Sequence, residues 1–435
     1  MAHLPAESLD AFQARIGFRF REPSLLAQAL THRSFRPLGG EPCPPSNERL
    51  AFLGDAVVEA ILSFHLYATN PDWSRGGLSR VRSAAVCEAN LAEVGREFGL
   101  ADIMLVGKGE KRVRGQTRPS TLAGAVEAIC AAAYLETAAA TIYSFASQAG
   151  AGRILAAVMV QAATRPEVGD GVLWPGYDPA EVEDVTSHAS ISEDADSPGR
   201  DDLGALPSRL GFRFLDRSLL RQALTRASYL PKDADAAALA NERLAFAGDA
   251  FLNLGVAMHV YLRHPEATAG HLTKLRIATM ADRALGRVGR EFGLGSYLLM
   301  GPREEAVGGR ERPSVLAGAL KALIGAAVLA TRPDASRLAI RGLVIRLMGS
   351  SLARLEQDPG TDYKASLQDW GQRVRKAVPI YRVVDESGSA HEKIFTVEAR
   401  LKGQVLGAGR GRSRRAADQN AAKDALMKLP DAERR

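Results

Sequence analysis

A serine and two arginines stand together where the last predicted helix begins. Ser413, Arg414 and Arg415 directly precede a helical pattern over 416–429. The first turn of a helix exposes backbone N–H groups and carries the positive end of the helix dipole, and each arginine adds a planar guanidinium group. This combination favours the binding of phosphate groups. The alternative is a basic helix end that is only solvated.

Acidic residues in an early helical stretch indicate another kind of chemistry. Glu48 and Asp55 lie on one predicted helix and face the same way. Their carboxylate oxygens are the hard ligands that Mg²⁺ prefers. At about 1.5 Å per residue, however, they lie roughly 10 Å apart along the helix axis. We therefore do not expect Glu48 and Asp55 to share one metal ion.

A long internal repeat sets the domain organisation. Ile16–Phe20 returns at 210–214, and Asn47–Phe52 returns at 241–246, both with an offset of 194 residues. A period this long is too large for a solenoid, so each copy is predicted to be a domain of roughly 140 residues. Two such copies in one chain indicate an intramolecular pseudo-dimer.

Apolar residues within each copy recur at three- and four-residue steps, which predicts helices, and no alternating strand pattern competes. The fold class is therefore mostly α. We expect a first copy over 7–160, an acidic linker over 161–204, a second copy over 205–350 and a separate C-terminal module over 360–430.

The C-terminal module changes character. Its pattern predicts a helix over 362–376, strands over 380–384, 394–399 and 404–406, and a helix over 416–429, which is an α-β-β-β-α order. The glycine-rich segment 407–411 is expected to be a connection that leads into the last helix.

The positive charge of the chain is concentrated in this module. The whole chain has 56 Lys and Arg against 50 Asp and Glu, and residues 362–435 alone have 16 against 10, so the full excess of +6 lies there. Attraction to a polyanion is therefore expected from the C-terminal module. The apolar share of 46% and charged share of 24% exclude a wholly disordered or fibrous chain.

The sequence gives few indications of the cellular compartment. Three cysteines are too few and oddly numbered for a disulfide framework, which indicates a reducing compartment. The first residues lack a basic-then-apolar signal pattern, and no stretch reaches about 18 uninterrupted apolar residues. We expect a cytoplasmic protein with no membrane partner.

Two sets of motifs carry a family resemblance. Asn47–Ala56, preceded by Ala29–Ser34 and followed by Gly77–Arg82, resembles the signature of the ribonuclease III family, and the second copy repeats it at 241–250. The C-terminal module resembles a double-stranded-RNA-binding domain through 362–364, 367–368, 388–391 and 413–416. The resemblance implies a metal-dependent endonuclease for double-stranded RNA that works as a dimer, each half cutting one strand.

The resemblance also implies four carboxylate ligands for each site, and most of them are missing here. The first copy has Ala51, Asp55, Gly124 and Glu127 at these positions, and the second has Ala245, Asp249, Gly318 and Lys321. Asp55 and Glu127 are the residual candidates for catalysis and for binding Mg²⁺ or Mn²⁺. The alternatives are a structural hydrogen-bonding role for Asp55 and a solvated or ion-paired Glu127.

For the C-terminal module, the resemblance implies minor-groove contacts by Gln368 and His391. It implies phosphate contacts by Arg414 and Arg415 at the helix start, where Ser413 also lies. A-form RNA presents a wide, shallow minor groove and its phosphates, so such a module would read shape rather than sequence.

We therefore expect a monomer that binds double-stranded or structured RNA and cleaves it weakly or not at all. One alternative is an active endoribonuclease that works through the first copy and processes precursor RNA. A second alternative is a non-catalytic scaffold bound to ribosomes or precursor RNA. Mg²⁺ or Mn²⁺ is expected only if the protein is active.

Overall fold

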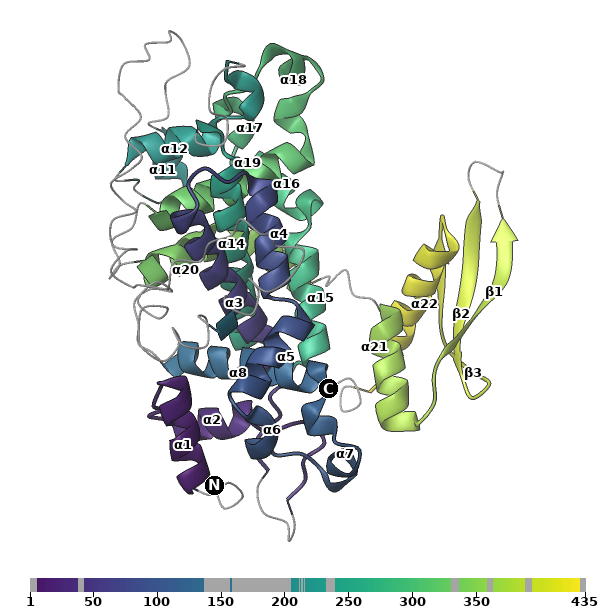
Figure 1. The fold of residues 1–435 in the computed structure, drawn as a ribbon. Helices are drawn as coiled ribbons and strands as arrows, with labels where there is room; N and C mark the ends of the chain where they lie inside the picture. The colour runs from purple at the N-terminus through teal and green to yellow at the C-terminus, as the bar shows by residue number, and fades with distance from the viewer. Residues whose placement is uncertain are drawn as a thin grey trace. The chain divides into compact units, whose positions relative to one another are not determined.

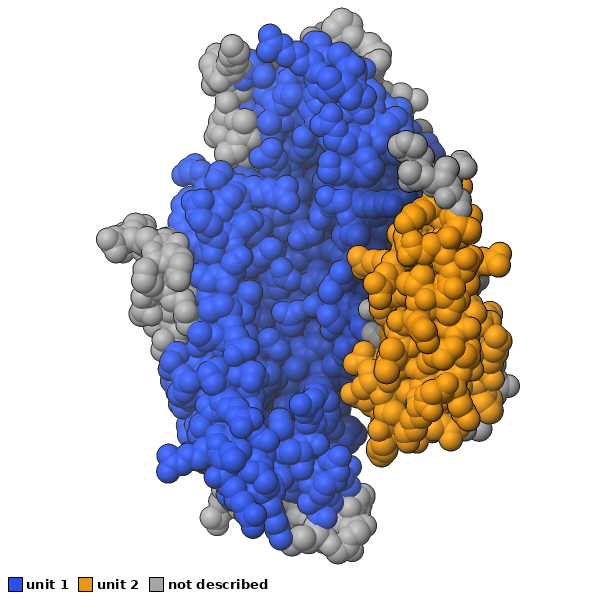
Figure 2. All heavy atoms as spheres, turned by 90° about the vertical axis from the view of Figure 1, so that its right-hand side faces the viewer, with its two compact units in different colours: residues 1–353 blue, residues 354–435 orange. Residues whose placement is uncertain are grey.

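The computed structural model describes residues 6–37, 43–136, 157–158, 205–210, 212, 214, 216–231, 239–329, 336–357, 363–387 and 393–430. The chain divides into two compact units, Met1–Ala353 and Arg354–Arg435, which Figure 2 colours separately. The predicted linker, 161–204, lies outside the described residues. The boundaries expected from the sequence remain predictions.

The first unit holds both copies, and the helices that the two copies share follow one another in the same order (Figure 1). The second copy also has η4 and α20, which have no counterpart among the described elements of the first copy. The first copy contains α1 (Ala6–Ile16), α2 (Pro23–Ala29), α3 (Glu48–Thr69), α4 (Arg75–Ala85), α5 (Glu88–Glu97), α6 (Leu100–Ile103), α7 (Lys108–Arg112), η1 (Gly115–Thr117) and α8 (Pro119–Glu136). The second copy contains α11 (Ala205–Leu210), α12 (Arg217–Leu224), η4 (Ala227–Tyr229), α14 (Glu242–Arg263), α15 (Ala269–Met280), α16 (Asp282–Glu291), α17 (Leu294–Tyr297), α18 (Pro302–Ala306), η5 (Gly309–Glu311), α19 (Pro313–Leu329) and α20 (Ser336–Gln357).

The equivalent helices α4 and α15 begin for the same local reason. The Ser74 side chain accepts a hydrogen bond from the Gly77 N–H at the start of α4, and Thr268 does the same for His271 at the start of α15. Such caps satisfy N–H groups that the first turn leaves without a partner. Each copy is then built on its longest apolar helix, since α3 packs on α8 and α14 packs on α19. The two long helices also pack on each other, which joins the copies.

Side chains of each copy contact and bury residues of the other copy. The ring of Phe246 is buried in a cluster with Leu66, Leu78 and Val81 of the first copy. Arg243 reaches across to the end of α3, and Arg49 reaches across to the end of α14. Arg243 donates hydrogen bonds to the carbonyl oxygens of Tyr67, Asn70 and Trp73. Arg49 donates hydrogen bonds to the carbonyl oxygens of Tyr261, His264 and Ala267, which are the equivalent positions. The two copies therefore pack directly on each other within the first unit.

The two core helices also bear on the membrane question. Among the described residues, α3 and α14 are long and apolar enough to cross a membrane by length and composition alone, although charged residues interrupt the apolar run of each. In the folded chain, 67% of the apolar window of α3 and 72% of that of α14 is buried. The helices that form a protein core pass the same test.

The second unit has the predicted α-β-β-β-α order (Figure 1). It contains α21 (Tyr363–Trp370), a π-helical turn (Gly371–Arg375), β1 (Ile380–Ser387), β2 (Ile394–Leu401), β3 (Gln404–Gly411) and α22 (Arg414–Lys428). The strands form one antiparallel sheet in the order β1-β2-β3.

The glycine-rich segment was wrongly expected to be a connection. Gly407, Gly409 and Gly411 lie within β3 and pair with β2. A Cβ atom at any of the three would overlap the backbone of α22. The glycines are therefore needed because the last helix packs directly on the backbone of this strand.

Candidate functional site

A close helix crossing brings the two remaining acids of the first copy together. A Cβ atom at Gly54 in α3 would overlap the carbonyl group of Glu127 in α8, so the two backbones touch at this point. Asp55 directly follows Gly54. Gly248 in α14 makes the same close approach to the carbonyl of Lys321 in α19. The glycine of the repeated signature thus sets the geometry of both sites.

The carboxylate of Asp55 already has a cationic partner. Arg276, from α15 of the second copy, lies with its Nη1 atom 2.7 Å from Asp55 Oδ2, and only 16% of its side chain is exposed. The guanidinium group also lies over the ring of Phe52. A guanidinium group of the second copy therefore balances the negative charge of Asp55 in the first copy.

Glu127 lies in an environment that disfavours its charge. Burial, together with the nearby negative charge of Asp55, raises the pKa of Glu127 to about 8, although Arg276 acts in the opposite direction. Glu88, the first residue of α5, adds to this rise. A protonated carboxyl group is a poor metal ligand. The sequence did not single out Glu88, although its recurrence as Asp282 at the same offset is a signal that could have found it.

The second copy places a cation among its acids. Lys321 Nζ lies 3.1 Å from Asp249 Oδ1 and 3.6 Å from Asp282 Oδ1. The lysine that would repel a metal ion therefore forms ion pairs with the acids that remain.

The positions of the missing carboxylates are adjacent in space. A Cβ atom at Gly124 would meet only the Cβ atom of Ala51, at 4.0 Å, and one at Gly318 would meet nothing within 4 Å. Within the described part of the chain, no three or more His, Cys, Asp or Glu side chains are arranged to hold a metal ion. The residues of both copies therefore do not fit a divalent-metal site of the kind that the resemblance implies.

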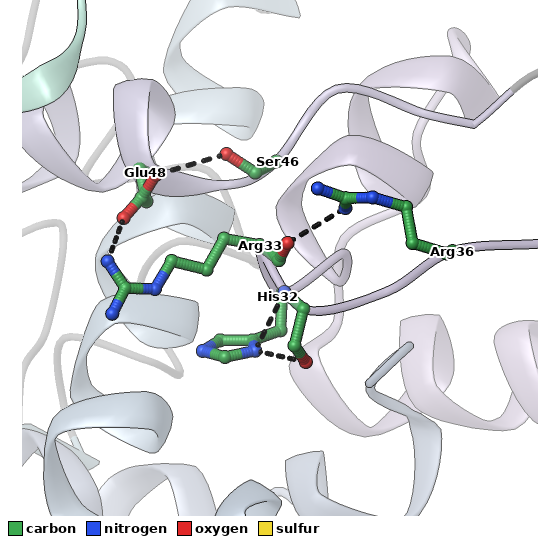
Figure 3. A network of polar contacts seen from close by, with 6 residues as sticks. His32, Arg33, Arg36, Ser46 and Glu48 are labelled. Atoms are coloured by element: carbon green, nitrogen blue, oxygen red, sulfur yellow. Dashed lines mark hydrogen bonds and ion pairs between the residues drawn. The ribbon is translucent and has the colours of Figure 1, made fainter. Parts of the chain in front are cut away.

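Glu48, the first residue of α3, is engaged by residues of the segment that precedes this helix. Its Oε1 atom lies 3.3 Å from Arg33 Nη1, and Ser46 Oγ donates to its Oε2 atom at 3.5 Å (Figure 3). Arg33 belongs to the segment that precedes α3, where His32 contacts Ser34 and Arg36 donates to the Arg33 carbonyl. Glu48 thus holds this segment and has its own partners.

Other signature residues also form structural hydrogen bonds in both copies. The Asn47 side chain donates to the Ala29 carbonyl at 3.2 Å, and Asn241 donates to the Ala223 carbonyl at the same distance. With the cross-copy arginines and the crossing glycines, the retained signature residues shape the fold. The carboxylates that are lost, at positions 51, 124, 245, 318 and 321, are all ones that the resemblance assigns to metal binding.

A basic segment distinguishes the first copy. Residues 108–118 carry five Lys and Arg and one Glu, a net charge of +4, whereas the equivalent 302–312 carry three of each sign. Lys108, Lys111, Arg112 and Arg114 are all exposed. This segment is a candidate contact for an anionic partner that sequence reasoning missed, because the charge averages out over the whole copy.

The C-terminal module presents most of its predicted contact residues to solvent. Gln368 on α21 is exposed, as are Arg414 and Arg415 in the first turn of α22. The Ser413 side chain accepts a hydrogen bond from the Ala416 N–H at 3.2 Å, so it caps this helix. His391 lies outside the described residues. The RNA contacts assigned to these residues remain predictions.

Comparisons with known proteins agree with this architecture. A family model described as ribonuclease-III-like matches residues 22–151 and again residues 216–345, and a double-stranded RNA binding motif matches residues 363–429. The chain belongs to the ribonuclease-III-like family. The two family matches cover both copies, with Asp55 and Glu127 in the first and Asp249 and Lys321 in the second.

Similar relatives carry the name Ribonuclease 3. The protein of Desulforamulus reducens is 40% identical over 225 residues, which are 52% of this chain and 90% of the relative. That of Pelotomaculum thermopropionicum is 42% identical over 231 residues, 53% of this chain and 94% of the relative. Among solved structures, the nuclease domain of ribonuclease III from Campylobacter jejuni is 33% identical with a TM-score of 0.31, covering 35% of this chain and 96% of that domain.

Proposed function

We propose that this ribonuclease-III-like protein binds double-stranded or structured RNA and cleaves it weakly or not at all. The observation that carries this proposal is the state of the two former metal sites. The first site lacks two of four carboxylates and the second lacks three. An ion pair with Arg276 or Lys321 engages the aspartate that remains in each. Cleavage in this family generally depends on a divalent metal, and these donor sets do not fit one.

Two basic surfaces support RNA binding. The start of α22 presents Arg414 and Arg415 beside exposed backbone N–H groups, which suits phosphate contacts along an A-form duplex. The exposed cations of residues 108–118 offer further phosphate contacts on the first copy. Because the equivalent segment of the second copy is neutral, we expect the first copy to contact RNA more strongly.

We further propose a monomer located in the cytoplasm. The packing of α3 on α14 and the reciprocal arginine contacts already occupy the surface through which one copy would pair with another chain. The three cysteines are all free thiols, which supports a reducing compartment.

A cleavage and binding assay on one labelled duplex RNA tests the function. We expect the wild-type chain to shift the duplex, and to leave it uncut in Mg²⁺ or Mn²⁺. The variant Ala51→Glu with Gly124→Asp restores both missing carboxylates of the first copy, and the space beside Gly124 can accept the new side chain. We expect this variant to nick one strand in an EDTA-sensitive way, because only one copy is repaired.

The matched control is Ala51→Gln with Gly124→Asn, which has the same shape without the charges. Efficient EDTA-sensitive cleavage of both strands by the wild-type chain would refute the proposal. Single-strand nicking by the wild type that Glu127→Ala abolishes would instead support an enzyme that works through the first copy. Co-sedimentation with ribosomal particles, without affinity for free duplex RNA, would support a scaffold.

A further inference from the structure

Lys321 is enclosed by two carboxylates from two other helices. Its Nζ atom lies 3.1 Å from Asp249 on α14 and 3.6 Å from Asp282 on α16. Only 13% of the Lys321 side chain and 28% of the Asp249 side chain are exposed, so water screens this attraction less than that of Asp282, whose side chain is 57% exposed. One ammonium group thus joins α19 to α14 and α16.

The first copy has the same three positions, but the charge at one of them is reversed, because Glu127 stands where the second copy has Lys321. Asp55, Glu88 and Glu127 precede Asp249, Asp282 and Lys321 by 194 residues each. The negative charges of Asp55 and Glu88 disfavour the charge on Glu127 there, and the balancing cation, Arg276, pairs with Asp55 from the other copy. The second copy carries its balancing cation within its own fold.

Backbone packing keeps Lys321 in this place. A Cβ atom at Gly248 would overlap the Lys321 carbonyl, and a Cβ atom at Gly325 would overlap the Leu244 carbonyl. α14 and α19 therefore touch along this stretch, and position 321 lies at their crossing. A side chain of either charge at this position has to meet the same two aspartates.

We propose that Lys321 is a built-in cation that stands in the place of a divalent metal ion and holds α14, α16 and α19 together. The second copy is then a structural half of the pseudo-dimer that keeps its shape without metal. This role does not depend on whether the protein binds or cleaves RNA.

Thermal unfolding of the full chain tests the role of this cation. Lys321→Met keeps most of the length and removes the charge, and Lys321→Glu rebuilds the acidic cluster of the first copy. We expect Lys321→Met to lower the melting temperature in EDTA by about 5 to 10 °C, because the partly buried Asp249 and the more exposed Asp282 both lose their cationic partner. Lys321→Glu should lower it further and recover part of the loss in millimolar Mn²⁺. Lys321→Glu with Asp249→Asn should lose that recovery.

The converse variant in the first copy gives a matched control. Glu127→Lys places a cation between Asp55 and Glu88, and we expect it to melt no lower than the wild type in EDTA. If Lys321→Met melts with the wild type, or Lys321→Glu is as stable as Lys321→Met in EDTA, the cation does not hold the helices. If Mn²⁺ leaves Lys321→Glu unchanged, Lys321 does not stand in the place of a metal ion.

Discussion

Arg243 joins the two copies in a way that a single substitution can test. Its guanidinium group donates hydrogen bonds to two carbonyl oxygens at the end of α3 and to one in the connection to α4, and only 5% of the residue is exposed. These carbonyls belong to Tyr67, Asn70 and Trp73. The last carbonyl groups of a helix have no partner within the helix, and they carry the negative end of its dipole. Arg243→Ala removes their common donor.

The size of the effect follows from these contacts. A hydrogen bond from a charged donor contributes about 1.5–3 kcal/mol, and a buried carbonyl left without a donor costs about 1–3 kcal/mol. The guanidinium group also lies 4.9 Å from the ring centre of Tyr67, a further contact of about 0.5–1 kcal/mol. Water entering the space left behind would satisfy some of the carbonyls. We therefore expect Arg243→Ala to lower the free energy of unfolding by about 3–5 kcal/mol.

Urea unfolding followed by circular dichroism measures this change. Arg49→Ala should cost a similar amount, because Arg49 donates to the three equivalent carbonyls at the end of α14. Arg80→Ala, at an exposed arginine on α4, should change the stability by less than about 0.5 kcal/mol. Arg243→Lys keeps the charge but cannot serve three acceptors with the same geometry, and it should recover less than half of the loss. A wild-type value for Arg243→Ala, or full recovery by lysine, would refute the reasoning.

Three further predictions concern RNA binding, pH and the C-terminal sheet. Arg415→Ala should weaken duplex RNA binding and reduce the slope of log affinity against log salt by about one, whereas Gln368→Ala should weaken binding with the slope unchanged. Fluorescence anisotropy at several salt concentrations measures both the affinity and the slope. Equal slopes for wild type and Arg415→Ala would count against a phosphate contact. Because the pKa of Glu127 is raised, the folded chain keeps a proton that the unfolded chain releases, and the contribution of Glu127 to stability is lost as the pH rises from about 4.5 through about 8. Glu127→Gln should therefore flatten the dependence of the melting temperature on pH over this range. Parallel profiles for the variant and the wild type would show that burial does not govern this group. Gly409→Ala should lower the melting temperature of the C-terminal module, because the new Cβ atom overlaps the backbone of α22. Ala408→Gly, at an exposed side chain of the same strand, should lower the melting temperature less, and equal losses for the two variants would contradict this packing.

Much of the fold followed from local sequence patterns. The offset of 194 residues predicted two equivalent helical domains, and periodicity predicted the α-β-β-β-α module. The error at Gly407–Gly411 shows the limit of such patterns. Glycines read as a flexible connection when the sequence is taken alone, and only the helix that packs on them shows why they lie in a strand.

The candidate sites were predicted less completely. The loss of ligands at 51 and 124 was visible in the sequence, because it required only the resemblance and the residue types. The partner of Asp55 was not visible, since Arg276 lies 221 residues away in the other copy. Glu88 was also missed, because its importance depends on what surrounds it in space. The basic segment 108–118 was missed because its charge averages out over the whole copy.

The sequence by itself determined that this chain holds two depleted copies of one domain and a basic C-terminal module, because repeats, residue types and charge are properties of the chain. The tertiary structure decided what the remaining charges do. The crossing at Gly54 places Glu127 in a buried, acidic environment, and the pseudo-dimer supplies Arg276 to Asp55. Charge interactions depend on distance and burial rather than on order along the chain. For that reason, the ion pairs that now engage Asp55 and Asp249 appear only once the helices are packed.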